Sequence, residues 1–171
     1  MTAIPLHWVS RCRQYRVHVS AECLRNMIRL ATESLPQEIG TSLYGSYTAD
    51  GFHAQVLGHG PVALDSRGSR FGFVRGIEGS RRFFVSLYRK TRGQKHYVGE
   101  WHSHPGGPPA PSGVDDINQT RIAQDARTNC PECIMLILAG IIPSAVSLGV
   151  YVYSRKHGRV DLTPEEDSDQ G

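Results

Sequence analysis

The 171-residue sequence contains no apolar run near the ~20 residues that a membrane-spanning helix requires. Residues 1–16 hold neither a continuous apolar segment nor a small-residue cleavage site, so we expect no secretory signal. The chain has only 4 cysteines, and their spacing is not typical of a disulfide framework. These absences predict a protein of the reducing cytoplasm with no membrane contact.

Several catalytic and binding motifs are missing too. No glycine-rich loop is followed by Lys-Ser or Lys-Thr, which argues against a nucleotide-binding loop. Aromatic residues do not alternate with basic ones as on an RNA-stacking sheet, so we do not expect a nucleic-acid partner. Cys130 and Cys133 have redox-motif spacing, but strand-like residues follow them where a redox motif needs a helix. We interpret both as free thiols near the core and leave their role open.

The composition, with 39% hydrophobic and 20% charged residues, is typical of a folded domain of ordinary size. Hydrophobic periodicity predicts helices and strands that interleave along the chain, which indicates an α/β (α+β) fold with a sheet flanked by helices. We expect an N-terminal extension at 1–14, one domain at 15–162 and a disordered acidic tail at 163–171. The predicted strands are 15–19, 40–47, 52–58, 96–103, 133–139 and 146–153, the predicted helices are 20–34, 78–92 and 112–127, and a loop ends near residue 76.

Positive charge is concentrated between Arg67 and Lys95, where nine Lys or Arg residues accompany one acid, Glu78. One interpretation is a solvated helix face. The other is a docking surface for an acidic partner, in which Arg81 and Arg82 border the substrate groove.

The most informative segment begins Gly-Glu-Trp-His-Ser-His-Pro at Gly99. Residues two apart on a strand point to the same face, so His102 and His104 can present two imidazoles to one point. Glu100 lies on that face as well, while Trp101 and Ser103 face the other way. Taken alone, such a histidine pair is more often structural than metal-binding.

A Pro/Gly-rich turn follows the histidines and leads into the predicted helix that begins near Ser112. It can bring Asp115, in the first turn of that helix, back toward the imidazoles. Two imidazoles, one carboxylate and an open fourth position form the ligand set of a hydrolytic zinc site. Ser112 and Asp115 also fit a helix-capping pattern, and capping is compatible with metal binding.

The spacing His102-x-His104, seven residues, Ser112, two residues, Asp115 resembles the signature of the JAMM (JAB/MPN+) metalloprotease family. These are zinc isopeptidases that remove ubiquitin or ubiquitin-like modifiers. The family pattern includes an upstream glutamate, which Glu38 matches, although Thr41 stands where a second glycine is common. The resemblance extends over roughly residues 16–153 and implies a JAB/MPN-type domain with a mixed, curved, cytidine-deaminase-like sheet.

More narrowly, the Gly-Glu-Trp-His-Ser-His-Pro phrase, with Pro61 and Asp65 upstream, is similar to bacterial JAB proteins. Those proteins are encoded beside activating-like and conjugating-like enzymes. Some belong to anti-phage systems in which a nucleotidyltransferase or another target is conjugated through its C-terminal residue. The resemblance therefore implies that the partner of this protein is a ubiquitin-like modifier or a conjugated target protein, which it would release from the conjugate.

The resemblance also implies roles for individual residues. His102, His104 and Asp115 would hold one Zn²⁺, Glu38 would be the general acid and base acting on the water at the zinc, and Ser112 would stabilise the oxyanion. Glu100 is the open alternative, since it could orient an imidazole or act as the acid/base itself. A base must lie across the water from the ligands, and this geometric requirement favours Glu38.

Three functions compete at this point. The complete Glu/His/His/Ser/Asp set favours a zinc metallo-isopeptidase that hydrolyses the bond after the C-terminal residue of a modifier. A catalytically inert binding module of the same fold is the second hypothesis. The third is a nucleic-acid-processing protein of this fold, which the basic run favours slightly.

Overall fold

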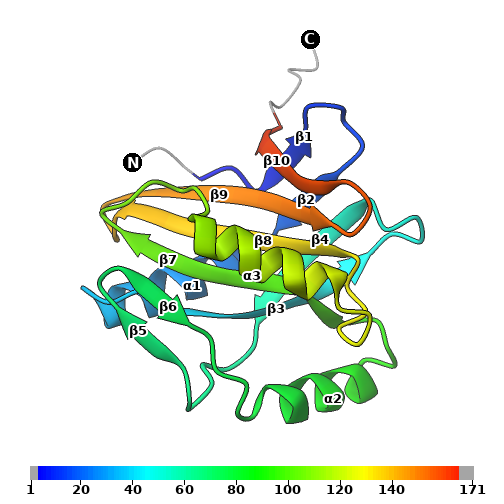
Figure 1. The fold of residues 1–171 in the computed structure, drawn as a ribbon, viewed down its shortest axis with the longest axis horizontal. Coiled ribbons are helices and arrows are strands. Elements are labelled where there is room, and N and C mark those ends of the chain that lie inside the picture. The colour runs from blue at the N-terminus through cyan, green and yellow to red at the C-terminus, as the bar shows by residue number, and fades with distance from the viewer. Residues whose placement is uncertain (1–3, 166–171) are drawn as a thin grey trace.

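A computed structural model describes residues 4–165 of the chain (Figure 1). Among these residues, no helix combines the length and the apolar character needed to cross a membrane. The strands are β1 (His7–Ser10), β2 (Arg16–Val19), β3 (Gly40–Tyr47), β4 (His53–His59), β5 (Arg67–Ser69), β6 (Gly72–Val74), β7 (His96–Pro105), β8 (Glu132–Ile141), β9 (Ala145–Ser154) and β10 (Gly158–Pro164), and the helices are α1 (Ala21–Ser34), α2 (Ser80–Lys90) and α3 (Gly113–Gln124).

Eight strands form one strongly curved mixed sheet in the order β1-β10-β9-β8-β7-β3-β4-β2, and β1 also pairs with β2. The pairs β2–β4 and β7–β8 are parallel, and the other neighbours are antiparallel. The short β5–β6 hairpin stands apart from this sheet. Figure 1 shows α3 across one face of β7, β8 and β9, with the hairpin and α2 beyond the β3–β7 side. The α+β class expected from the sequence is confirmed.

Strand β8 separates two apolar cores because its side chains alternate between the two faces of the sheet. Ile134, Leu136 and Leu138 pack into the larger core, which includes α1 and Trp101. Met135 and Ile137 pack into the smaller core beneath α3. The strand is therefore buried on both faces, which explains its continuous apolar sequence.

Helix α1 forms where the sequence predicted a helix. The side chain of Ser20 accepts a hydrogen bond from the backbone N–H of Cys23 at 3.2 Å, which caps the first turn. The buried residues follow at three- and four-residue spacing, and Leu35, followed by Pro36, caps the other end. The buried face consists of Cys23, Leu24, Met27 and Ala31.

The structure adds strands that periodicity did not predict. β1 lies within the segment 1–14 that was expected to be an extension, because Trp8 and Val9 are buried and pair with β10 and β2. β10 continues to Pro164, two residues beyond the expected domain limit. Glu165 pairs with Arg13 and Arg16, while the rest of the predicted disordered tail lies outside the described residues.

Two further corrections concern the basic segment. The loop predicted up to residue 76 contains β5 and β6, whose three-residue strands are too short to show an alternating pattern. Helix α2 begins at Ser80, two residues later than expected. Asp65 explains this start, since its carboxylate accepts hydrogen bonds from the backbone N–H groups of Ile77 (3.1 Å) and Glu78 (2.9 Å) and holds them outside the helix.

Thr41, the departure from the family pattern, has a structural explanation. The indole N–H of Trp101 donates a 2.8 Å hydrogen bond to the Thr41 hydroxyl, and both side chains are buried. A buried indole N–H needs such an acceptor. Thr41 thus fixes the largest side chain of the strand that carries the two histidines.

Replacing Thr41 with valine keeps the shape and removes the acceptor. We expect Thr41→Val to lower the free energy of unfolding by about 1–3 kcal/mol, because the Trp101 N–H stays buried without a partner. Chemical denaturation measures this change, with Thr120→Val on the exposed side of α3 as the matched control. Equal stability of the two variants would contradict this role of Thr41.

Candidate metal centre

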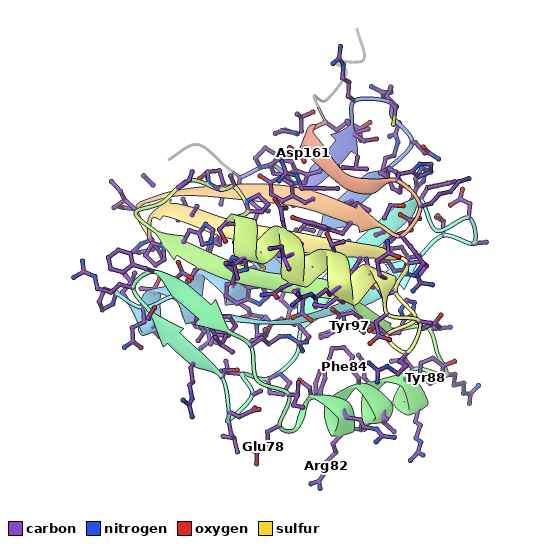
Figure 2. All side chains as sticks on the ribbon, viewed as in Figure 1. Glu78, Arg82, Phe84, Tyr88, Tyr97 and Asp161 are labelled. Carbon is purple, nitrogen blue, oxygen red and sulfur yellow. The ribbon has the colours of Figure 1, made fainter. Side chains whose placement is uncertain are left out.

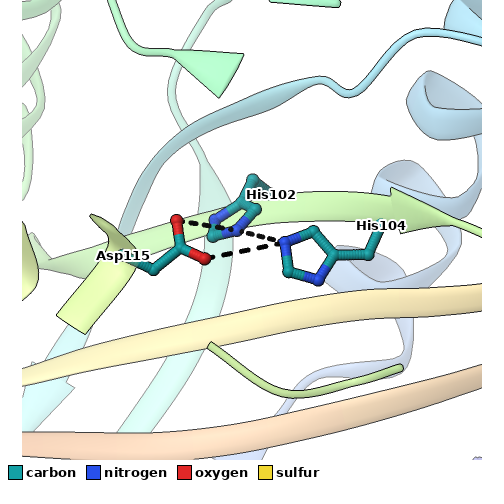
Figure 3. Close-up of side chains that lie close together, drawn as sticks. All are labelled: His102, His104 and Asp115. Atoms are coloured by element: carbon teal, nitrogen blue, oxygen red, sulfur yellow. Dashed lines mark hydrogen bonds and ion pairs between the residues drawn. The ribbon is translucent and has the colours of Figure 1, made fainter. Parts of the chain in front are cut away.

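His102 and His104 converge near the end of β7 (Figure 3). Their Nε2 atoms lie 2.9 Å apart, and His102 is 7% exposed. The strand alternation that places Trp101 in the α1 core directs both imidazoles toward α3. The sequence prediction that these side chains share one face is confirmed.

Asp115 approaches the imidazoles from the first turn of α3. Its Oδ1 lies 3.4 Å from Nε2 of His102, and its Oδ2 lies 3.7 Å from Nε2 of His104. A capping box fixes this turn: Ser112 Oγ accepts from the Asp115 N–H at 3.2 Å, and Asp115 Oδ2 accepts from the Ser112 N–H at 2.7 Å. The predicted cap is confirmed, and it orients the carboxylate.

These donor atoms fit a single small cation. One ligand atom from each of His102, His104 and Asp115 lies within 4.8 Å of the others. Ligands of a tetrahedral zinc ion are separated by ~3.3 Å, which is close to the spacing observed. Nδ1 of His104 lies 3.2 Å from the carbonyl oxygen of Pro108, an acceptor, so the proton belongs on Nδ1 and the Nε2 lone pair faces the centre.

The site is electrostatically organised for a cation. Burial lowers the pKa of His104, and the neighbouring His102 lowers it further, which favours the neutral, ligating imidazole. Burial alone would raise the pKa of Asp115, but its contacts with His102 and its hydrogen bonds with Ser112 hold that pKa well below the usual range. The carboxylate is therefore ionised at neutral pH. Imidazole nitrogens and a carboxylate are donors that zinc prefers.

Two side chains anchor α3 in this position. Asp116 accepts hydrogen bonds from the Tyr153 hydroxyl and pairs with Arg159 at 3.0 Å, which ties the helix to β9 and β10. Gln119 is buried and donates to the carbonyl of Ile134 at 3.1 Å, which ties it to β8. The orientation of Asp115 thus depends on contacts well outside the ligand set.

Glu38 lines a cleft of about 830 Å³ together with two of the three residues, His104 and Asp115. It precedes β3, and its backbone N–H donates to the carbonyl of Ser69 at 2.8 Å, which joins it to the β5–β6 hairpin. Burial raises the pKa of Glu38, the interaction with His102 lowers it, and the interaction with Asp115 raises it further. The cleft also contains His104, Ser112 and Asp115.

Glu100 occupies a different environment, although it shares the strand face of the histidines. Its buried carboxylate pairs with Arg75 Nε at 3.1 Å and accepts hydrogen bonds from Tyr97 (2.6 Å) and Ser42 (3.3 Å). Burial raises the pKa of Glu100, while Arg75 counteracts this effect. Sequence reasoning missed Arg75 as the partner of Glu100, because the two residues are 25 positions apart and a loop and a helix separate them.

The structure does not bring Arg81 and Arg82 to the metal cleft. Both lie on α2 and line a separate groove. The cleft is lined instead by other members of the basic run, Arg67 and Arg70, which come from the β5–β6 hairpin. The hairpin residues Phe71 and Val74 line it as well. Sequence reasoning missed these hairpin residues, because the segment shows no helical or strand periodicity and was predicted to be a loop.

Comparisons with known proteins agree with this geometry. The family described as prokaryotic homologues of the JAB domain matches residues 20–156. The chain belongs to that family. A CD-NTase/cGAS isopeptidase of Enterobacter hormaechei is 34% identical over 148 residues, which cover 86% of this chain and 81% of that protein. Another CD-NTase/cGAS isopeptidase, from Pseudomonas aeruginosa, is 31% identical over 85 residues, 50% of this chain and 51% of that one.

A solved structure supports the fold of this JAB domain. The solution structure of protein DSY2949 from Desulfitobacterium hafniense has a TM-score of 0.58 and 23% sequence identity, and the match covers 85% of this chain and 88% of that one. The family membership and fold class expected from the residues are thus confirmed.

The ligand set makes a direct prediction. We expect the purified protein to bind about one zinc ion per chain, and Asp115→Ala to bind it at least ~10-fold more weakly because one of three protein ligands is lost. Elemental analysis after dialysis against a graded chelator measures both. Asp50→Ala, which removes an exposed carboxylate outside the cleft, is the control. Unchanged zinc retention in Asp115→Ala would contradict the assignment.

Glu100 and Arg75 are expected to support the strand rather than the reaction. Arg75→Met leaves the buried Glu100 carboxylate without its cation and should lower the free energy of unfolding by about 3 kcal/mol. The control is Arg29→Met, which breaks the exposed pair with Glu33 and should cost less than about 1 kcal/mol. Loss of zinc without loss of stability in Arg75→Met would instead place Glu100 in the metal environment.

Proposed function

We propose that this protein is a zinc-dependent isopeptidase that removes a conjugated protein or a ubiquitin-like modifier from its target. The observation that carries the proposal is the convergence of His102, His104 and Asp115, with Glu38 lining the same cleft as His104 and Asp115. The named activity of the 34%-identical relative supports the same reaction class.

Zinc held by His102, His104 and Asp115 would supply a Lewis acid and lower the pKa of water at the site. Glu38 is positioned to take a proton in the cleft and return it to the leaving amine. Its raised pKa suits a group that must both accept and release a proton. Glu38 is a better candidate than Glu100, whose carboxylate is already occupied by Arg75 and Tyr97.

Ser112 can stabilise negative charge that develops on the substrate carbonyl. Its Oγ accepts the N–H of Asp115 through a lone pair, so the hydroxyl hydrogen is left to donate into the cleft. The residue is exposed and lines the cleft beside Asp115. A donor at this point suits the oxyanion of acyl transfer.

The substrate we propose is a conjugate whose modifier is attached through its C-terminal residue. The relatives are named for isopeptidase action on CD-NTase or cGAS proteins. A nucleotidyltransferase of that kind is therefore the first candidate, with activating-like and conjugating-like enzymes as functional partners. A ubiquitin-like modifier is the alternative substrate.

Glu38→Gln tests this function. We expect zinc content and melting temperature to stay at the wild-type level while kcat falls about 10²–10⁴-fold, because the carboxamide cannot take up the proton. The substrate is a CD-NTase from the same genome fused through its C-terminal residue to a reporter protein, and cleavage is followed by gel electrophoresis. Glu22→Gln on α1, outside the cleft, is the control.

Full cleavage by Glu38→Gln would contradict the assigned acid/base. A zinc-loaded wild-type protein that cleaves neither this fusion nor a ubiquitin-like fusion would instead support the binding-module hypothesis.

A further inference from the structure

A second groove, of about 1100 Å³, lies between α2 and the segment that follows β4. None of the residues that line it lines the metal cleft. Figure 2 shows Phe84 directed from α2 toward Tyr97 of the sheet, while Arg82 points away into solvent. The aromatic pairs Phe83–Tyr44 and Phe84–Tyr97 attach the inner face of α2 to the sheet. The other face of α2 lines the groove.

The groove follows one continuous stripe of the helix. Residues at positions 81, 82, 85, 86, 89 and 90 recur at helical spacing and all line it. Arg81 and Arg82 stand at one end, Arg89 and Lys90 at the other. Within residues 4–165 none of these four cations forms an ion pair, and Glu78 is the only acid among the lining residues.

The middle of the groove is apolar and open. Val62 is 38% exposed, Leu64 86% and Val85 41%. Apolar side chains framed by unpaired cations are typical of a surface that binds an amphipathic, acidic partner.

The cations at the start of α2 do not serve the helix itself. Its first turn carries Arg81 and Arg82 and no acid, and Gly79 supplies no side-chain cap. Positive charge at a helix N-terminus opposes the helix dipole, so acids would stabilise α2 better. Residues that weaken a helix locally are expected where they serve binding, so Arg81 and Arg82 fit a binding surface.

One segment connects this groove to the metal cleft. Residues 61, 62, 64, 78 and 79 line the groove, and residues 67–74 between them line the cleft. Asp65 clamps the segment at its base through the N–H groups of Ile77 and Glu78. A protein body bound in the groove would therefore lie next to the cleft into which its chain end must reach.

We propose that the α2 groove is a docking site for an acidic, amphipathic segment on the body of the conjugated protein that is cleaved. The two cation pairs are eight residues apart on the helix, or ~12 Å at 1.5 Å per residue. An extended partner chain covers this distance in ~4 residues at 3.3 Å each. The matching segment has two adjacent apolar residues with one pair of acidic residues on each side of them. The identity of the partner as substrate rests on the proposed isopeptidase function.

The binding test uses a fluorescein-labelled peptide, Gly-Glu-Glu-Val-Leu-Glu-Glu-Gly, and fluorescence anisotropy at fixed salt. The second probe, Gly-Val-Leu-Glu-Glu-Glu-Glu-Gly, has the same charge and composition without the spacing. The groove variant combines Arg81→Glu, Arg82→Glu, Arg89→Glu and Lys90→Glu. The control variant makes the same change in net charge at exposed positions elsewhere, with Arg11→Glu, Arg25→Glu, Arg121→Glu and Lys156→Glu.

We expect the spaced peptide to bind the wild type more tightly than the rearranged one. The groove variant should raise its Kd about 10-fold or more, since four favourable charge contacts become repulsive, and the control variant should leave it within about 2-fold. Arg89→Gln with Lys90→Gln provides a milder test in case the fourfold reversal disturbs the fold. The same binding by groove and control variants, or no preference between the peptides, would overturn the proposal.

Cleavage of the CD-NTase fusion separates this proposal from the proposed function. If the wild type is active and KM rises about 10-fold in the groove variant but not in the control variant, the result supports both the docking site and the isopeptidase function. Equal KM in the groove and control variants overturns the groove while leaving the isopeptidase intact. If the protein binds the spaced peptide but cleaves no fusion, the groove is a docking site, but the claim that its partner is the substrate is refuted. Tighter groove-dependent binding of duplex DNA, anionic vesicles or a second copy of the chain than of the peptide would replace the proposed occupant.

Discussion

The approach of Asp115 to the two histidines of β7 is the contact on which the candidate site depends. A strand can place His102 and His104 on one face, but it cannot place a carboxylate opposite them. The capping box between Ser112 and Asp115 does this by fixing the first turn of α3. One side chain thus serves both the helix start and the metal centre, and Oδ2 both accepts the Ser112 N–H and faces His104.

This contact is held from two directions. Asp116 and Gln119 tie α3 to the neighbouring strands, and the Thr41–Trp101 hydrogen bond fixes β7 from the opposite core. Because β8 lies between both cores, movement of either α1 or α3 would be transmitted to the strand beside the histidines. These polar contacts add to the apolar packing beneath α3 in setting the position of the ligands.

The segment between β4 and α2 gives the site its surroundings. Its hairpin forms one wall of the cleft and holds the backbone of Glu38, and its ends line the groove beside α2. Gly68 permits the close approach, because a Cβ there would meet the Glu38 carbonyl oxygen. The segment that leads to the exposed cations of α2 thus also contacts the acid/base candidate, Glu38.

Much of this arrangement could be predicted from the sequence, and each missing part has a physical reason. The sequence pattern is strong for α1, for β8 and for the His-x-His strand, so these elements were predicted, as was the face that His102 and His104 share. The Ser112–Asp115 pattern combines a cap and a ligand within four residues, which makes it readable without tertiary contacts. The strand β1 and the Arg75–Glu100 pair depend on partners far away in the chain, whereas the two strands of the β5–β6 hairpin are too short to show an alternating pattern. The placement of Arg81 and Arg82 away from the cleft depends on how α2 packs, which charge counting does not reveal.

The measurement that tests the central claim most directly is anomalous X-ray diffraction at the zinc edge from crystals grown with zinc. We expect one strong peak per chain, bonded to Nε2 of His102, Nε2 of His104 and the carboxylate of Asp115 at ~2.0–2.2 Å. A zinc peak held by other residues, or no peak between these three side chains under zinc-replete conditions, would contradict the account.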